Sequence, residues 1–343
     1  MTLHVLHLVG SAVDEFHCKL SCLYAQSCLQ GTQNDERYRF TIAYITPDRC
    51  WRFPKSLDST DIAAAPAHSL SAALQILIDQ NIDVAVPQMF CVPGMTEYRS
   101  LLTLLQIPFV GNLAEVMALT ADKAKTRSVV AAAGVPIPAG ELLRSGDSPN
   151  LQPPVIVKPV NTDNSMGVSL VKTAEDYRLA LETAFKFSSE VLVEQYIEPG
   201  REVRCGVVEA DNDPNGELQV LPLKEYLLDP QSRPIRTFDD KLQPGDSGEL
   251  VIVAREGIES DVVAADDPTI PAIAAAAKQA HRALGCRHYS LFDFRIDPIG
   301  KPWFIEAGLY CSFSPNAVIP SMMKHAGVPL EEFFANMIGR VLA

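Results

Sequence analysis

Two carboxylates stand at the ends of neighbouring apolar segments near the C-terminal end of the chain. Asp293 follows the apolar run Tyr289–Phe292, and Glu306 follows Trp303–Ile305. The turn-forming residues Asp297–Gly300 between the two runs predict a β-hairpin that brings the acids side by side. Hard carboxylate oxygens on rigid strands suit Mg²⁺, which binds one or two carboxylates and completes its shell with substrate phosphates. Acids at strand ends more often simply face water. The residues upstream must therefore show whether these two bind a metal.

Residues suited to a nucleoside triphosphate precede the two acids. Lys123 opens a helical segment, Lys158 stands near the end of an apolar strand, and the loop 161–167 consists of polar and small residues. Lysines neutralise phosphate charge, and a loop can cover phosphates with backbone N–H groups. The GxxxxGK(S/T) motif of phosphate-binding loops is absent, as is the GxGxxG of dinucleotide-binding folds. The order of groups predicts a Mg²⁺–ATP site of a different type.

Composition and charge narrow the class of protein. The chain has 343 residues, 47% of them hydrophobic and 21% charged, which indicates a globular protein of two or three domains. Its formal net charge is −13 and no basic residues cluster, so we expect no nucleic acid partner. The first ten residues lack a basic n-region, and no apolar run reaches membrane-spanning length, so neither a signal peptide nor a membrane segment is expected. The eight cysteines form no CxxC or CxxH pair, which argues against zinc and favours free thiols in the cytoplasm.

Strand and helix patterns alternate along the N-terminal third. Strand patterns fall at 5–9, 40–45, 84–86 and 109–110, and helical patterns at 20–29 and 70–80. This alternation predicts an α/β domain whose parallel sheet carries helices on both faces. A helix that opens at 121–127 ends before Gly134 and the prolines that follow it. We therefore place the first domain boundary near residue 120, so that the N-terminal domain is 1–120.

Two further units are predicted. The central unit, 121–200, has strand patterns at 155–158, 168–171 and 190–196 and a helical pattern at 174–187. The C-terminal unit, 201–343, has a strand at 201–208, the hairpin of the two acids, and helices at 270–284 and 330–341. The segment 229–248 is rich in turn-forming residues and predicts a long surface loop, which in a compact domain tends to be functional.

The order and the residue motifs of these segments resemble those of the ATP-grasp superfamily and, within it, of the D-alanine–D-alanine ligases. The resemblance spans nearly the whole chain from Gly10 onward. Its most specific motifs are Val157-Lys158-Pro159 with 165–168, 193–194 with 200–203, 283–286 with 292–294, and 300–302 with 304–306. It implies an N-terminal parallel-sheet domain followed by a two-subdomain ATP-grasp fold. It also implies an ATP-dependent C–N ligase.

The resemblance assigns nucleotide-binding roles position by position. Three lysines would contact phosphates: Lys123, Lys158 and Lys241. Three loop residues would cover the phosphates: Ser165, Met166 and Gly167. Three residues would frame adenine, and Glu202 would take the ribose hydroxyls; the adenine residues are Glu194, Gln195 and Ile197.

The resemblance also assigns the metal and catalytic roles. Asp293 and Glu306 would hold two Mg²⁺, with Glu306 bridging, and Mn²⁺ could replace Mg²⁺. The catalytic candidates are Lys241, Ser165 and Glu15. A charge on a solvated loop is the alternative for Lys241.

The acceptor side departs from the dipeptide ligases. Those enzymes carry an Arg two residues before the metal-binding Asp, where this chain has Leu291, and an Asn two residues after the Glu, where it has Gly308. The family's Tyr after the loop Lys is Leu242 here. Because an Arg holds carboxylates and acyl phosphates through a bidentate fork, its loss indicates substrates other than two D-alanines and an electrophile that is not an ordinary carboxylate.

Four segments, 5–13, 87–96, 285–297 and 306–313, resemble the cyanobacterial ligases of mycosporine-like amino acid biosynthesis. That resemblance implies that an amino acid, typically serine or threonine, is joined to mycosporine-glycine. The product would be an imine-type UV sunscreen such as shinorine or porphyra-334. The family also suggests a homodimer.

Candidates for the substrate subsite are Ser312, Ser314 and Tyr310. The alternatives are that the two serines face into a turn and that Tyr310 belongs to the core. For the whole protein, two other functions stay open: a ligase that makes an ordinary dipeptide or amide, and a non-catalytic nucleotide-binding protein.

Overall fold

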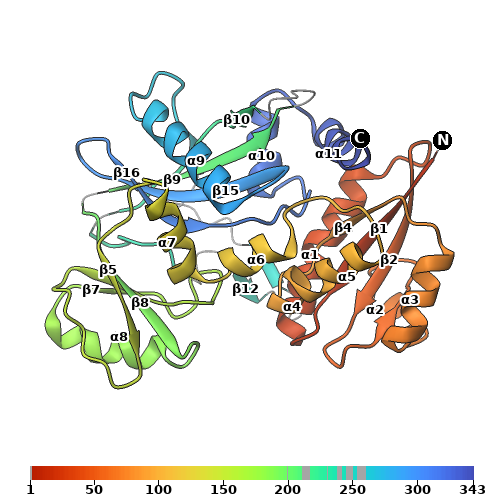
Figure 1. Ribbon diagram of the computed structural model, residues 1–343, viewed down its shortest axis with the longest axis horizontal. Coiled ribbons are helices and arrows are strands. Elements are labelled where there is room, and N and C mark those ends of the chain that lie inside the picture. The colour runs from red at the N-terminus through yellow and green to blue at the C-terminus, as the bar shows by residue number, and fades with distance from the viewer. Residues whose placement is uncertain are drawn as a thin grey trace.

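The computed structural model describes residues 2–198, 200–210, 217–229, 231–237, 242–244, 250–252 and 260–343. Three larger sheets organise it, one in the N-terminal part, one in the centre and one in the C-terminal part (Figure 1). Lys241 and much of the segment 229–248 lie outside the described residues. Within that segment β12 (Leu242–Pro244) pairs with β13 (Leu250–Ile252), so the expectation of a loop throughout was wrong.

The N-terminal sheet has the strand order β3-β2-β1-β4. Strands β1 (Leu3–Gly10), β2 (Tyr38–Ile45) and β4 (Val84–Pro87) are parallel, and β3 (Trp51–Arg52) adds an antiparallel edge. The predicted strand at 109–110 is only a bridge from Phe109 to Ala85. The predicted parallel sheet is confirmed.

Helices cover both faces of this sheet, because alternate residues of a buried strand point to opposite sides. Leu6 and Leu8 pack in one cluster with Ala73 and Leu77 of α3 (Leu70–Asp79). Val9 packs on the other side with residues of α1 (Glu15–Thr32). Helix α1 begins earlier than predicted because the Asp14 side chain caps it, accepting from the His17 backbone N–H at 2.8 Å.

Gly10 ends β1 where no other residue fits, which gives a stability prediction. Its φ is +98°, and an added Cβ would lie 2.1 Å from the Ile45 carbonyl oxygen. We expect Gly10→Ala to lower the free energy of unfolding by about 3 kcal/mol, from backbone strain and overpacking together. Gly146→Ala is the control, because Gly146 has φ of +97° but nothing within 4 Å of its Cβ. Equal losses in urea unfolding would contradict the role given to the Ile45 contact.

The central sheet is antiparallel, with the order β5-β8-β6-β7. Its strands are β5 (Gly140–Arg144), β6 (Val155–Pro159), β7 (Ser169–Val171) and β8 (Glu190–Gln195). Strand β5 was not predicted. The predicted helix at 174–187 is a 3-10 turn, Ala174–Asp176, followed by α8 (Tyr177–Ala184), which packs on the sheet through Tyr177 and Ala180.

The C-terminal sheet carries the two acids and has the order β14-β11-β9-β15-β16, with β10 also paired to β9. The hairpin is β15 (Tyr289–Ile296) and β16 (Pro302–Ala307), and β9 (Arg201–Glu209) lies antiparallel to β15. Three shorter strands complete it: β10 (Leu218–Val220), β11 (Lys224–Tyr226) and β14 (Ser260–Val262). The predicted hairpin is confirmed.

Helix α9 (Ile270–Leu284) has the predicted bounds and ends at Gly285, whose φ of +70° suits a left-handed cap. Helix α7 (Lys123–Ala132) packs against α9 and β16 through Val130, so the start of the predicted central unit joins the C-terminal core. Helix α11 (Leu330–Leu342) packs in turn against Tyr38 of the N-terminal sheet through Phe334. Helices α7 and α11 therefore pack against parts of the protein that belong to other predicted units than their own.

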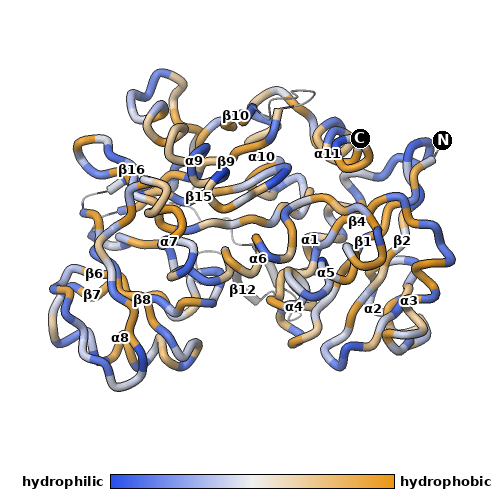
Figure 2. The backbone as a smooth tube through the Cα atoms, viewed as in Figure 1, coloured by the Kyte–Doolittle hydropathy of each residue, from blue (hydrophilic) through white to orange (hydrophobic). Residues whose placement is uncertain are grey.

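Five shorter helices complete the described chain: α2 (Ser59–Ala64), α4 (Val92–Met95), α5 (Glu97–Leu104), α6 (Ala114–Thr120) and α10 (Val318–His325). Figure 2 shows the interior strands of the N-terminal sheet as hydrophobic and many outer turns as hydrophilic. Among the described residues, no helix is both long enough and apolar enough to cross a membrane.

Candidate nucleotide and metal site

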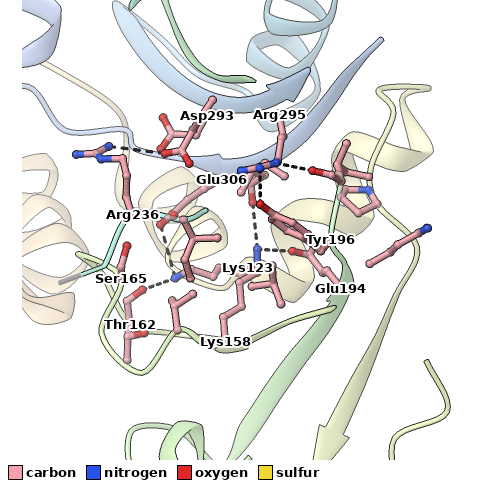
Figure 3. A pocket seen from close by; sticks show the side chains of 18 residues that line it. Lys123, Lys158, Thr162, Ser165, Glu194, Tyr196, Arg236, Asp293, Arg295 and Glu306 are labelled. Atoms are coloured by element: carbon pink, nitrogen blue, oxygen red, sulfur yellow. Dashed lines mark hydrogen bonds and ion pairs between the residues drawn. The ribbon is translucent and has the colours of Figure 1, made fainter. Parts of the chain in front are cut away.

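A cavity opens between the central and C-terminal sheets and encloses about 850 Å³, including space open to solvent. Its wall brings together nine of the residues expected from sequence, namely Lys123, Lys158, Ser165, Glu194, Gln195, Ile197, Glu202, Asp293 and Glu306 (Figure 3). The remaining wall residues include apolar side chains such as Ile156, Val168 and Ile305. Apolar walls with a few convergent polar groups are typical of a small-ligand site.

The two acids are direct cross-strand partners. Asp293 on β15 pairs in register with Glu306 on β16, and a bulge follows Asp293. Paired side chains share one face of a sheet, so both carboxylates face the cavity. Among the described residues, no cluster of three or more His, Cys, Asp or Glu side chains forms a metal cage. Two carboxylates that leave room for phosphates and water fit Mg²⁺ or Mn²⁺, and do not fit a closed structural zinc site.

Lys123 approaches the acids from the other side of the cavity. It is the first residue of α7, whose N-terminus is capped when the Asp122 side chain accepts the Lys125 N–H. The Lys123 ammonium donates to the Thr162 carbonyl and lies 3.6 Å from Glu306 Oε1. It therefore links the loop 161–167 to the metal acids, where phosphates that bind both would lie.

Lys158 and Glu194 form a buried ion pair in the cavity wall. The Lys158 ammonium contacts the Glu194 carboxylate and lies 3.4 Å from the Ile305 carbonyl oxygen. Arg127 reaches the same carboxylate, with Nε 3.1 Å from Oε1. The sequence suggested that Glu194 frames adenine. In the structure its carboxylate forms ion pairs with Lys158 and Arg127 while Glu194 also lines the cavity, and its adenine role stays a prediction.

Two cations of the cavity were missed by the sequence analysis. Arg295 donates to the Tyr196 hydroxyl at 2.6 Å and to the Ile197 carbonyl at 2.6 Å. Arg236 lies 3.6 Å from the ring centre of Tyr226 and 3.9 Å from the Glu202 carboxylate. The alternation of β15 was a usable signal for Arg295, since residues 293 and 295 share a face. Nothing local pointed to Arg236.

The covering loop folds on itself beside the cavity. Thr162 Oγ1 donates to the Met166 carbonyl at 3.0 Å, and the Met166 N–H donates to the Asp163 carbonyl. Ser165 lines the cavity, whereas Met166 and Gly167 do not. Gly167 has φ of +71°, and a Cβ there would lie 2.8 Å from both Phe187 and Pro159, so the turn requires glycine.

The remaining candidates lie away from the cavity wall. Glu15 is exposed in the first turn of α1. Ser312 and Ser314 are buried, and the Ser312 hydroxyl accepts the Ser314 N–H at 3.3 Å, which matches the alternative of a turn. Lys241, the third phosphate candidate, lies outside the described residues.

Tyr310 stands between the metal acids and the N-terminal domain. Its ring packs on Phe90 with ring centres 5.2 Å apart. The negative charge of Asp163, burial and the charge of Glu306 together raise the pKa of the Tyr310 hydroxyl well above its usual value. Tyr310 therefore stays a neutral hydroxyl, beside the acids but not in the cavity wall.

Comparisons with known proteins agree with this geometry. Residues 144–339 match the family model described as D-ala D-ala ligase C-terminus. The D-alanine–D-alanine ligase of Trichlorobacter lovleyi is 30% identical over 75% of this chain and 77% of its own, and that of Agrobacterium fabrum is 31% identical over 69% and 71%.

Solved structures match over 99% of this chain. VanG D-Ala:D-Ser ligase from Enterococcus faecalis superposes with a TM-score of 0.76 at 22% identity over all of its chain, and the ligase from Coxiella burnetii with 0.75 at 19% over 94%. These likenesses establish the fold. Taken with the matched segment and the two relatives, they show that the chain belongs to the D-alanine–D-alanine ligase family, whose members are ATP-dependent ligases of the ATP-grasp fold.

Proposed function

We propose that the protein is an ATP-dependent ligase that joins an amino acid, serine or threonine, to mycosporine-glycine. One observation carries the proposal. The nucleotide side of the site is assembled, with Lys123, Lys158, Asp293 and Glu306 around one cavity. The acceptor side lacks the groups that hold an amino-acid carboxylate in the dipeptide ligases.

The acceptor-side difference has a structural basis. Leu291 is 7% exposed and belongs to an apolar cluster with Met322 of α10. Gly308 donates its N–H to the Leu291 carbonyl at 2.8 Å and has no side chain to offer a metal. Neither position offers a side-chain donor to a carboxylate, which suits an electrophile whose reacting oxygen belongs to a conjugated ring and not to an amino-acid carboxylate.

The chain's residues would support two transfers. First, the ring-carbonyl oxygen of mycosporine-glycine bonds to the γ-phosphorus of ATP, the bond from that phosphorus to the β–γ bridging oxygen breaks, and ADP leaves. Then the amine of the amino acid bonds to the ring carbon, the bond from carbon to the phosphorylated oxygen breaks, phosphate leaves, and the nitrogen loses its protons to give the imine.

In the first transfer Lys123 and Lys158 would neutralise phosphate charge as the phosphoryl group moves. Asp293 and Glu306 would hold Mg²⁺, two ions in our proposal, and the metal would supply electrostatic stabilisation of the transferring group. Glu202 would take the ribose hydroxyls. The apolar walls beside Gln195 and Ile197 would hold adenine.

A ligase for an ordinary dipeptide is the second candidate. It is favoured by the relatives, whose names are D-alanine–D-alanine ligase. The two candidates differ in the electrophile and share the use of ATP. A homodimer stays a prediction, which light scattering of the purified protein would test.

The experiment is ADP release from Mg·ATP with mycosporine-glycine, with and without L-serine or L-threonine, while the ultraviolet spectrum is recorded. We expect release that depends on both substrates, with a red shift as the ketone-type chromophore becomes an imine. Turnover with D-alanine and not with mycosporine-glycine would replace the proposal with the dipeptide ligase. Nucleotide binding without turnover on a wide amino-acid panel would favour a non-catalytic protein.

A further inference from the structure

Four charged side chains form a row across one face of the C-terminal sheet. Glu306 pairs in register with Asp293, Asp293 with Arg204, and Arg204 with Lys224. Directly paired residues point to the same face, and neighbouring strands lie about 4.8 Å apart. The row therefore runs from two carboxylates on β16 and β15 to two cations on β9 and β11.

Arg204 forms a bidentate ion pair with Asp293. Its Nε lies 2.7 Å from Oδ1, and its Nη2 donates to Oδ2 at 3.0 Å. Both side chains are mostly buried, at 18% and 16% exposure. An arginine fork on both carboxylate oxygens neutralises the charge of Asp293, and its positive charge repels a divalent cation bound to the same carboxylate. A metal bound by Asp293 therefore favours a position of Arg204 farther from this carboxylate.

Lys224 makes it energetically unfavourable for Arg204 to leave Asp293 unless another anion binds nearby. It is partly buried, and no described carboxylate forms an ion pair with it. Burial and the neighbouring Arg204 charge both lower the pKa of Lys224. Once the metal takes Asp293, two like charges remain side by side in a sheltered position. Glu202 also lies close enough to favour the Arg204 charge, but it pairs with Arg236.

The anion nearest to a metal on Asp293 and Glu306 is the terminal phosphate of the bound nucleotide. Arg204 also lies near Leu291, the position at which the dipeptide ligases carry an Arg. Leu291 pairs with Gly206, so Arg204 is the diagonal neighbour of Leu291 on the same face, about 7–8 Å away and within an arginine's reach.

We propose that Arg204 is a catalytic residue of phosphoryl transfer, and that it moves from Asp293 to the γ-phosphoryl oxygens when the metal binds. The guanidinium that the dipeptide ligases carry at the Leu291 position is thereby supplied from the adjacent strand. Arg204 donates N–H groups to the γ-phosphoryl oxygens while the bond from phosphorus to the electrophile oxygen forms and the bond to ADP breaks. It transfers no proton. The proposal rests on the use of ATP and not on which electrophile accepts the phosphoryl group.

The first test needs no electrophile. A crystal structure of the full chain with Mg²⁺ and β,γ-imido-ATP should show an Arg204 nitrogen about 3 Å from a γ-phosphate oxygen, with Asp293 on the metal. An Arg204 that remains two-point bonded to Asp293, or that points away from the phosphates, would overturn the proposal. This result is independent of whether mycosporine-glycine is the substrate.

The second test is kinetic and uses whichever electrophile turns over. Arg204→Gln should lower kcat about a hundredfold to a thousandfold, as for the loss of one preorganised transition-state donor. Arg204→Lys should recover only part of the loss, because an ammonium lacks the fork. The KM values for ATP and both acceptors should change little. A loss confined to the KM of an acceptor would assign Arg204 to substrate binding and overturn the proposal.

Arg201→Gln is the matched control. Arg201 lies three residues earlier on β9, so it points to the opposite face, and it pairs with Glu225 at 2.6 Å and Asp267 at 2.8 Å. Neither Arg201 nor Arg204 lines the cavity, so the two differ in the face of the sheet and in the contact that Arg204 alone makes with Asp293. The Arg201 variant should keep kcat within about threefold even if its melting temperature falls. An equal kcat loss in both variants would mean that Arg204 acts only through stability.

Discussion

Glu306→Gln lowers kcat by at least about a hundredfold, an effect comparable to that expected for Arg204→Gln. The amide keeps the size of the side chain and removes the negative charge that, with Asp293, fits a divalent metal. Glu306 also lies 3.6 Å from the Lys123 ammonium, so the substitution weakens an ion pair with the lysine that we propose binds phosphate. The measurement is steady-state ADP release over a titration of Mg²⁺ and, separately, of Mn²⁺. We expect the Mg²⁺ concentration for half-maximal activity to rise.

Glu331→Gln serves as the control for this variant. Glu331 is exposed in the first turn of α11 and carries the same charge change far from the cavity. Its kcat and its Mg²⁺ dependence should equal those of the unmodified protein. An active Glu306→Gln with unchanged Mg²⁺ dependence would remove Glu306 from the metal site. Addition of excess EDTA to the unmodified protein should abolish ADP release.

Glu194→Gln has the largest expected effect on stability. The Glu194 carboxylate is almost fully buried and neutralises both Lys158 and Arg127. Removal of one member of a buried ion pair leaves an uncompensated charge and typically costs about 3–5 kcal/mol. We expect a loss of that size in the free energy of unfolding, measured by urea denaturation. The KM for ATP should also rise, because Lys158 loses the partner that positions it.

The same strand offers the matched control. Glu190 lies on β8 as well and pairs with Arg144 at 2.8 Å, but the Arg144 side chain is 75% exposed. Exposed ion pairs contribute at most about 1 kcal/mol, so Glu190→Gln should be nearly neutral. Equal losses in the two variants would show that burial of Glu194 does not govern its contribution. A bound nucleotide should restore part of the stability of Glu194→Gln through mass action.

Local patterns predicted the parts of the fold that depend on local chemistry. Helix α9 begins at Ile270 and ends at Leu284 as its apolar period and the following Gly285 indicate. The hairpin of β15 and β16 follows from two apolar runs and the turn at 297–300. Strand β5 was missed, because Gly140–Arg144 has no strong alternation and becomes a strand by pairing with β8.

Within the site, it was easier to predict which charged residues are present than to predict which of them form ion pairs with each other. Lys158 and Glu194 were both assigned to the nucleotide from their motifs, and both line the cavity. That they bind each other follows from the register of β6 and β8. Ile156 pairs with Glu194 and Lys158 with Leu192, so Lys158 and Glu194 are diagonal neighbours on one face of the sheet. A pairing register between distant segments has no signature in either segment alone.

The sequence alone determined that Asp293 and Glu306 form a paired acidic site and that Lys123 and Lys158 accompany it. The acids are close in the chain, so a single hairpin fixes their geometry. Only the tertiary structure decided that Arg204 faces Asp293 and that Arg236 and Arg295 enter the cavity. Arg204 and Asp293 are 89 residues apart, and strand pairing over that separation depends on the whole sheet. Local sequence therefore predicts the pair of carboxylates, whereas the pairing of distant strands decides which cations surround them.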